Sequence, residues 1–208
     1  MNDIYFTADT HFGHSPNQVG HGGIIFHAHR PFKNTDEMDQ VLIDNWNKTI
    51  GKKDVVYIIG DFCWRNHGHY FHALNGKKIL IVGSHDKMPQ DILKNFTEVH
   101  KYLGKLIDKT LVIMFHWCLR TWQGAIHGSI HLYGHSHGRL PEYDDSMCCD
   151  IGVDVWDYFP VPWEVVKYKM SLKKKKEFDT REGIEDNVKI NRERNLKCIE
   201  EMRESKSI

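Results

Sequence analysis

Aspartate and histidine side chains recur in five short stretches of this chain, and together they are typical of metal binding. The stretches are Asp9-Thr10-His11, Gly60-Asp61, Gly83-Ser84-His85-Asp86, His116 and Gly134-His135-Ser136-His137. Carboxylates and imidazoles in combination suit borderline divalent ions, with manganese first and iron, zinc, nickel and cobalt as alternatives. The six candidate ligands exceed one tetrahedral site: Asp9, His11, Asp61, His116, His135 and His137. The sequence therefore predicts two divalent ions that share a bridging carboxylate, for which Asp61 is the natural candidate.

Two such ions, about 3.5–4 Å apart, activate a shared water, bind phosphate oxygens and neutralise charge during in-line displacement at phosphorus. The expected reaction is hydrolysis of a phosphate ester by a hydroxide that bridges the metals, without a protein nucleophile. His85 and Asp86 are the candidate catalytic residues. An imidazole beside a carboxylate that fixes its tautomer can donate a proton to the departing oxygen.

Each stretch follows a short apolar run that predicts a buried strand. The runs are Ile4–Phe6, Val55–Ile59, Ile79–Val82, Leu111–Phe115 and Ile130–Tyr133. In an open α/β sheet, the loops at the carboxyl ends of the strands converge on one ligand site. We therefore expect the five stretches to meet. Gly60, Gly83 and Gly134 are expected to allow the sharp turns that aim the following side chains.

Helices are expected between these strands. Thr35 can cap a helix in which Met38, Val41, Leu42 and Trp46 recur at helical spacing. Further predicted elements are a helix ending at Leu74-Asn75-Gly76, a short helix with Pro89 in its first turn, a hairpin of 97–107 with 111–115, and a strand within 147–154. The pattern favours one α/β (α+β) domain over residues 1–170, with a charged helical extension at 171–208 packed on it.

The composition of the chain bears on nucleic-acid binding, on membrane binding and on the expected cellular location. Lys plus Arg (28) equals Asp plus Glu (28), so no basic footprint favours nucleic acid. No apolar run approaches the length of a membrane span, and no leader is evident, so we expect a soluble, unprocessed protein that does not bind membranes. The odd set of 5 cysteines lacks CxxC spacing, which favours reduced thiols and a cytoplasmic location. Of the 15 histidines, those outside the five stretches are mostly expected at the surface or in loops: His67, His69, His72, His100, His127 and His131.

The five ordered stretches resemble the five blocks of the calcineurin-like metallophosphoesterases. The resemblance covers about the first 160 residues and extends to residues 34–46 and 152–156, as in small bacterial and phage members. It implies a four-layer αββα sandwich of two mixed β-sheets flanked by helices. It also implies a first metal held by Asp9, His11, Asp61 and His137, and a second held by Asp61, His116, His135 and a residue of the third block.

The third block departs from the family at that last ligand, because this chain has Ser84 where members usually have asparagine. A serine hydroxyl is shorter and a poorer donor than a carboxamide oxygen. One explanation is a natural variant in which water completes the ligand shell, and the other is a substitution that weakens the second site. Because the second ligand set rests on Ser84, we predict that the second metal binds more weakly, with a lost ligand costing on the order of tenfold or more in affinity by analogy with lost supporting hydrogen bonds.

The loop after the first stretch offers candidate substrate contacts. Arg30 could hold a phosphate with its planar guanidinium, and His14 could meet a substrate oxygen. The alternative is a surface loop without substrate contact.

Three functions remain open from the sequence. The favoured one is hydrolysis of a small phosphorylated substrate, with a nucleotide-type phosphodiester preferred over a monoester. The others are a nuclease of the same superfamily and a scaffold that has lost turnover, like the metallophosphoesterase-like subunit of retromer. Ser84 is the sole support for the scaffold.

Overall fold

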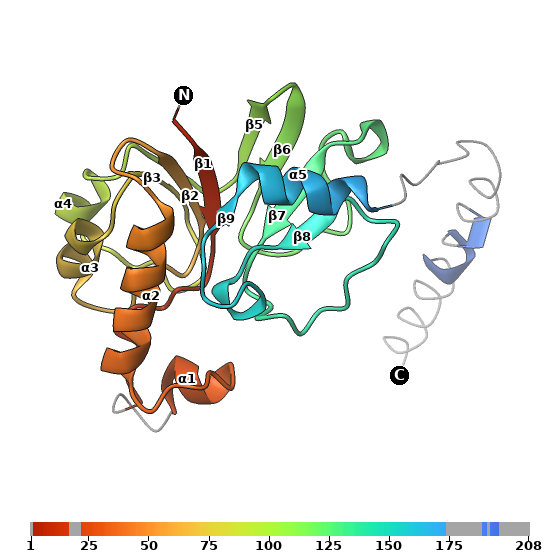
Figure 1. Ribbon diagram of the computed structural model, residues 1–208. Coiled ribbons are helices and arrows are strands. Elements are labelled where there is room, and N and C mark those ends of the chain that lie inside the picture. The colour runs from red at the N-terminus through yellow and green to blue at the C-terminus, as the bar shows by residue number, and fades with distance from the viewer. Residues whose placement is uncertain (1, 17–21, 174–188, 191, 196–208) are drawn as a thin grey trace, which may run out of the picture. The chain divides into compact units, whose positions relative to one another are not determined.

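The computed structural model describes residues 2–16, 22–173, 189–190 and 192–195 (Figure 1). The chain divides into two compact units, residues 1–175 and 176–208. The first unit contains all the predicted site residues. In the second unit, residues 189–190 and 192–195 are helical, and the rest of the expected extension beyond residue 173 lies outside the described residues.

The first sheet has the strand order β4-β3-β2-β1-β9. Its strands are β1 (Ile4–Thr7), β2 (Val55–Ile59), β3 (Lys77–Ile81), β4 (Glu98–His100) and β9 (Val161–Pro162). Strands β1 to β4 pair in parallel, and β9 pairs antiparallel to β1. The carboxyl ends of β1, β2 and β3 therefore meet at one edge of this sheet.

The second sheet has the order β5-β6-β7-β8. Its strands are β5 (Leu103–Ile107), β6 (Thr110–Met114), β7 (Ile130–Tyr133) and β8 (Cys148–Asp150). Strands β5 and β6 form the expected hairpin, with Asp108 and Lys109 at positive φ in its turn. Strands β6, β7 and β8 are parallel, so their carboxyl ends also meet at one edge.

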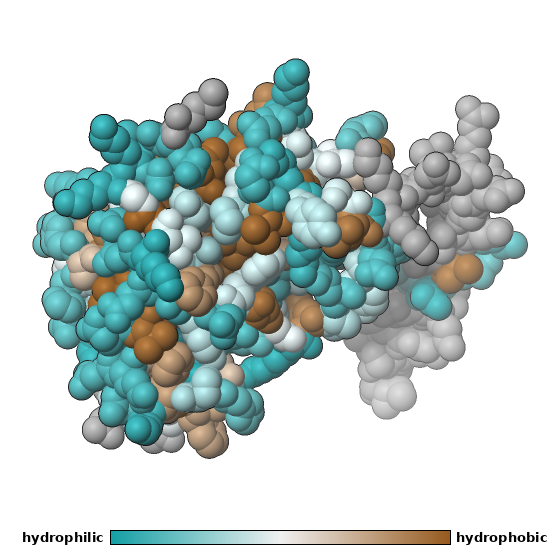
Figure 2. Space-filling model, viewed as in Figure 1, coloured by the Kyte–Doolittle hydropathy of each residue, from teal (hydrophilic) through white to brown (hydrophobic). Residues whose placement is uncertain are grey.

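Two apolar clusters hold the layers together. One cluster lies between the sheets and combines Phe6, Ile59 and Ile81 of the first sheet with Met114 and Leu132 of the second. The helix α5 (Trp163–Ser171) packs against this cluster. The other cluster joins the outer face of the first sheet to its helices, which are α1 (Gly23–His27), α2 (Thr35–Thr49), α3 (His67–Ala73) and α4 (Gln90–Leu93). Figure 2 shows hydrophilic residues over much of the viewed face, as expected where the apolar clusters are internal.

The predicted sandwich of two mixed sheets flanked by helices is confirmed, with local differences. Asn34 caps α2, because its Oδ1 accepts the Glu37 amide at 2.9 Å, and Thr35 is the first helical residue. The segment 97–107 divides between the sheets as β4 and β5. The expected strand 147–154 is strand only at 148–150 and continues into the 3₁₀ helix η2 (Val153–Val155).

The outer face of the second sheet is covered by residues 117–129, which include the 3₁₀ helix η1 (Ala125–His127). His131 lies on this face and is fully buried, in contrast to the expected surface or loop position. Among the described residues, no helix is long and apolar enough to cross a membrane.

Candidate metal centre

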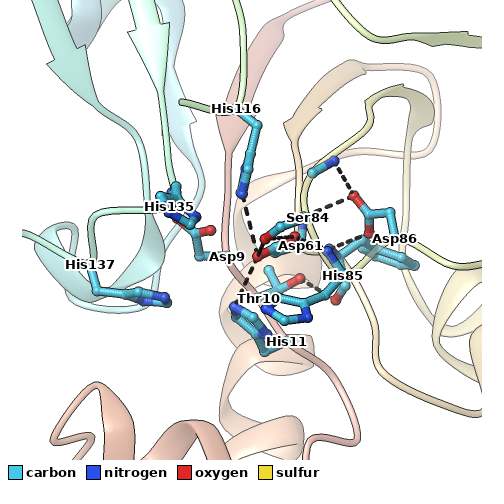
Figure 3. A network of polar contacts seen from close by, with 12 residues as sticks. Asp9, Thr10, His11, Asp61, Ser84, His85, Asp86, His116, His135 and His137 are labelled. Atoms are coloured by element: carbon cyan, nitrogen blue, oxygen red, sulfur yellow. Dashed lines mark hydrogen bonds and ion pairs between the residues drawn. The ribbon is translucent and has the colours of Figure 1, made fainter. Parts of the chain in front are cut away.

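The predicted stretches follow five strands and converge between the two sheets (Figure 3). The first sheet supplies Asp9 and His11 after β1, Asp61 after β2, and Ser84 to Asp86 after β3. The second sheet supplies His116 after β6, and His135 and His137 after β7. The site therefore depends on parallel strand ends from both sheets, as the strand pattern predicts.

The candidate ligands form two groups in which the ligand atoms lie within 4.8 Å of one another: Asp9, His11 and His137 in the first group, and Asp61, His116 and His135 in the second group. The Asp61 carboxylate belongs to the second group and also lies close to the first group, because its Oδ2 is 3.4 Å from His116 Nε2 and 3.6 Å from His11 Nε2. This position is the one that a bridging carboxylate requires.

Three of the ligand atoms are buried without a hydrogen-bond partner among the described residues: Asp9 Oδ1, His11 Nε2 and His116 Nε2. An unpaired buried polar atom costs about 1–3 kcal/mol, so such atoms call for a ligand. His116 is held in the correct orientation, because its Nδ1 lies 2.9 Å from the carbonyl oxygen of Ile59 and its Nε2 faces the centre. The donor set thus fits two divalent cations.

Five of the candidate ligands adopt the left-handed backbone conformation. The φ angles are 56° at Asp9, 51° at His11, 52° at Asp61, 66° at His135 and 48° at His137. Each such residue costs on the order of 1–3 kcal/mol, and these conformations cluster at functional sites. This backbone conformation directs each side chain from the strand end towards the candidate metal centre.

Three glycines permit this close approach. A Cβ atom at Gly60, which has φ of 85°, would lie 2.2 Å from His116 Nδ1, and a Cβ atom at Gly83 would lie 2.4 Å from Asp61 Oδ1. Both distances are too short for any side chain. At Gly134, the third glycine predicted to have a geometric role, a Cβ atom would lie 2.6 Å from Asp9 Oδ2, so lack of space explains all three glycines.

Burial and mutual charge control protonation in the centre. Burial raises the pKa of Asp9 to about 7 despite the opposing effect of His137 and His116. Burial also disfavours the charged forms of Asp61 and His116, but the contact between them outweighs it. The Asp61–His116 contact holds the pKa of Asp61 well below its usual range and raises the pKa of His116 to about 9. A divalent cation would favour the ionised form of both carboxyl groups and the neutral form of His116.

Ser84 contacts the Asp61 carboxylate. Its Oγ donates to Asp61 Oδ2 at 3.0 Å, and the amide of His85 donates to Asp61 Oδ1 at 2.8 Å. The Ser84 hydroxyl and the His85 amide therefore orient Asp61 together.

Asp86 has a different partner from the one expected. Its carboxylate accepts the backbone amides of Asp61, Phe62 and Gly83 at 2.8–2.9 Å, and no hydrogen bond joins it to the His85 ring among the described residues. It therefore ties the β3 loop to the β2 loop and acts as a positioning residue. The His85 ring faces the centre, with its centroid 5.7 Å from that of His11.

Arg30 is also placed differently from its expected role as a phosphate ligand. Only 4% of the residue is exposed, and its guanidinium donates to both oxygens of Asp154 at 2.7 and 2.9 Å and to the carbonyl of Asp9 at 2.6 Å. Asp154 in turn lies 2.7 Å from His137 Nδ1, which leaves Nε2 free to bind a metal. Arg30 therefore holds Asp154 in place, and Asp154 orients the His137 ring of the first group.

Sequence reasoning did not assign Asp154 a role, although the motif resemblance extended over residues 152–156. It also missed Trp64, whose ring stacks on His14 at a centroid distance of 4.1 Å and an interplanar angle of 2°. The available signal was its place three residues after Asp61. Burial lowers the pKa of His14 to about 4, so this ring is neutral, and its centroid lies 5.5 Å from that of His11. A substrate contact by His14 stays a prediction.

Proteins of similar sequence and of similar structure are known for this chain. No protein-family model matches it. The uncharacterized protein MJ1445 of Methanocaldococcus jannaschii is 30% identical over 179 residues, which cover 80% of this chain and 90% of the relative. The chain belongs to the MJ1445 family.

A phage protein and a solved structure extend this family-level result. The Gene 66 protein of Mycobacterium phage D29 is 24% identical to this MJ1445-family chain over 190 residues, covering 75% of this chain and 90% of the phage protein. The structure of AQ665 from Aquifex aeolicus, a protein of unknown function, has a TM-score of 0.62 and 22% identity, covering 81% of this chain and 99% of AQ665. AQ665 therefore shares the fold. The resemblance of the five ordered blocks to the calcineurin-like metallophosphoesterases stays a sequence-level resemblance beside this shared fold.

Proposed function

We propose that this protein is a metal-dependent hydrolase of phosphate esters, with a nucleotide-type phosphodiester as the favoured substrate. The observation that carries the proposal is the pair of neighbouring three-residue ligand groups, each with at least one buried ligand atom that lacks a hydrogen-bond partner among the described residues. Formal neutrality of the chain favours a small substrate over a nucleic acid.

The two cations, when bound, supply an activated water and neutralise charge on the phosphoryl group. The chain holds them in place from both sheets: the backbone turns at Asp9, His11, Asp61, His135 and His137 aim the side chains inward. His85 is the proposed proton donor to the leaving oxygen, because its ring lies beside the first group and its own amide is fixed to Asp61.

The second group is proposed to bind its metal more weakly than the first group. The first group has the Arg30–Asp154 pair behind His137. In the second group, the Ser84 hydroxyl donates a hydrogen bond to Asp61 and, among the described residues, has no comparable role in orienting a histidine ligand. The native metals under this proposal are two divalent ions, with manganese tested first.

Hydrolysis of bis(p-nitrophenyl) phosphate and p-nitrophenyl phosphate with manganese tests the proposal, followed by a panel of nucleotides and cyclic nucleotides. We expect the diester to be hydrolysed faster than the monoester. Asp61→Asn removes the bridging charge and is expected to abolish turnover, while Asp157→Asn, at an exposed position, is the matched control. If neither the wild-type protein nor Ser84→Asn hydrolysed any substrate of the panel, the proposed hydrolase activity would be refuted.

Metal analysis separates the enzyme from the scaffold. Close to two equivalents of transition metal per chain would support catalysis. Absence of bound metal at saturating manganese, in a folded protein, would leave the scaffold as the better account of the retained fold.

A further inference from the structure

Two cysteines from distant parts of the chain meet on the outer face of the second sheet. Cys148 begins β8 and is buried, whereas Cys118 lies in the segment after β6 and is exposed. Neither residue contributes to the metal centre. Both are free thiols.

His131 of β7 brings these cysteines together. Its Nε2 accepts the backbone amide of Leu119 at 3.1 Å, and its Nδ1 lies 3.2 Å from the carbonyl oxygen of Ile113. His131 is also the register partner of Cys148, and partners in a ladder point to the same face of a sheet. The ring therefore anchors the residue next to Cys118 while Cys148 lies beside it.

The two thiols line one cavity of about 330 Å³, together with Tyr133, Leu140 and Tyr143. The Cys118 thiol is the largest cause that lowers the pKa of Cys148 to about 6, as expected for neighbouring thiols in one cavity. Ser146 Oγ also lies 3.2 Å from the Cys148 sulfur. Both sulfurs are thus accessible to a small molecule in the cavity and already near each other.

We propose that Cys118 and Cys148 form a peroxide-reactive dithiol site that closes to an intramolecular disulfide. This site is independent of the proposed hydrolase function. The S–S bond requires the sulfurs to approach to about 2 Å.

The reaction balances with a hydroperoxide as oxidant. The Cys148 sulfur attacks one peroxide oxygen, the O–O bond breaks, and the departing oxygen leaves as water or an alcohol, giving a sulfenic acid. The Cys118 sulfur then attacks the Cys148 sulfur, the S–O bond breaks, and the departing hydroxyl takes the Cys118 thiol proton and leaves as water. Two thiols are oxidised by two electrons, and one peroxide is reduced.

The test treats the full chain with one equivalent of hydrogen peroxide and maps its peptides without reduction. We expect a linkage between the Cys118 and Cys148 peptides within one chain, the loss of two free thiols, and recovery of both with dithiothreitol. Cys118→Ser and Cys148→Ser should each abolish the linkage. The matched control is Cys149→Ser, because Cys149 is adjacent but faces the core between the sheets.

Phenylarsine oxide, which crosslinks neighbouring thiols, gives a second measurement on the unmodified protein. One equivalent should protect Cys118 and Cys148 from maleimide and leave the reactivity of the other thiols unchanged. Several results would overturn the proposal: oxidation of Cys118 alone to sulfinic acid, disulfides solely between chains, a linkage that involves Cys149, or no protection by the arsenical. These results are decisive even if a serine variant fails to fold.

Discussion

The contact between Arg30 and Asp154 gives the sharpest test of how this centre is built. Arg30 has a side chain without solvent exposure, and Asp154 is its charged partner at 2.7 Å. Removing one partner of a buried ion pair costs about 3–5 kcal/mol, because the other charge stays buried and uncompensated. Asp154→Asn keeps one acceptor oxygen, so we expect the low end of this range, about 3 kcal/mol, in the free energy of unfolding of the metal-free protein.

The same substitution should weaken metal binding for a separate reason. The carboxylate of Asp154 accepts from His137 Nδ1, which leaves Nε2 as an acceptor for a metal. An asparagine amide at this position donates to Nδ1 instead and favours the tautomer with hydrogen on Nε2. Loss of such a supporting partner typically lowers metal affinity about 10–100-fold.

Urea unfolding in chelator measures the first effect, and manganese titration against a chromophoric chelator measures the second. The double variant Arg30→Met/Asp154→Asn should recover stability, since no lone charge remains, but keep the weakened metal affinity. Asp157→Asn serves as the control, with an expected change within about 0.5 kcal/mol for an exposed site. If Asp154→Asn matched this control in both assays, the positioning role of Asp154 would be wrong.

Three further outcomes follow from single contacts. Gly60→Ala places a methyl group 2.2 Å from His116 Nδ1, so thermal or urea unfolding should show a loss of about 2–4 kcal/mol; unchanged stability would contradict the packing argument. Ser84→Asn should raise the affinity of the second metal about tenfold in the same manganese titration, and a decrease would show that the hydroxyl is the better ligand. Burial raises the pKa of Asp39 to about 6, against 3.8 for its unperturbed side chain. The folded state therefore binds more protons between about pH 4 and 6, so stability should fall as pH rises through this window; Asp39→Asn should remove the slope, and an unchanged slope would assign it elsewhere.

The sequence predicted the strands, and the convergence of the candidate ligands, because both depend on local pattern. Val55–Ile59 and Ile130–Tyr133 are buried apolar runs, and the structure gives strands with the same bounds. The polar residue types directly after these strands required no knowledge of tertiary contacts. Parallel pairing then brings the strand ends together.

The side chains whose partners differ from the expected ones depend on contacts between residues far apart in sequence. Arg30 is 124 residues from Asp154, and nothing local indicates that its guanidinium turns inward. Asp86 illustrates the same difficulty at shorter range: its neighbour His85 suggested a catalytic pair, but backbone amides from 24 and 25 residues away occupy its carboxylate. His131 was expected at the surface because a lone histidine carries no sign of the face on which it lies.

Each ligand group combines residues from both sheets, and this arrangement links the metal centre to the packing of the sandwich. The first group takes Asp9 and His11 from the first sheet and His137 from the second, and the second group takes Asp61 from the first sheet and His116 and His135 from the second. Neither three-residue group is therefore complete without both sheets. The apolar cluster between the sheets therefore sets the distance between the two halves of the site, and strained loops on that rigid support fix the direction of each ligand. Because the cations would bind only the docked sheets, each should stabilise the folded state by about 2.7 kcal/mol at one hundred times its dissociation constant.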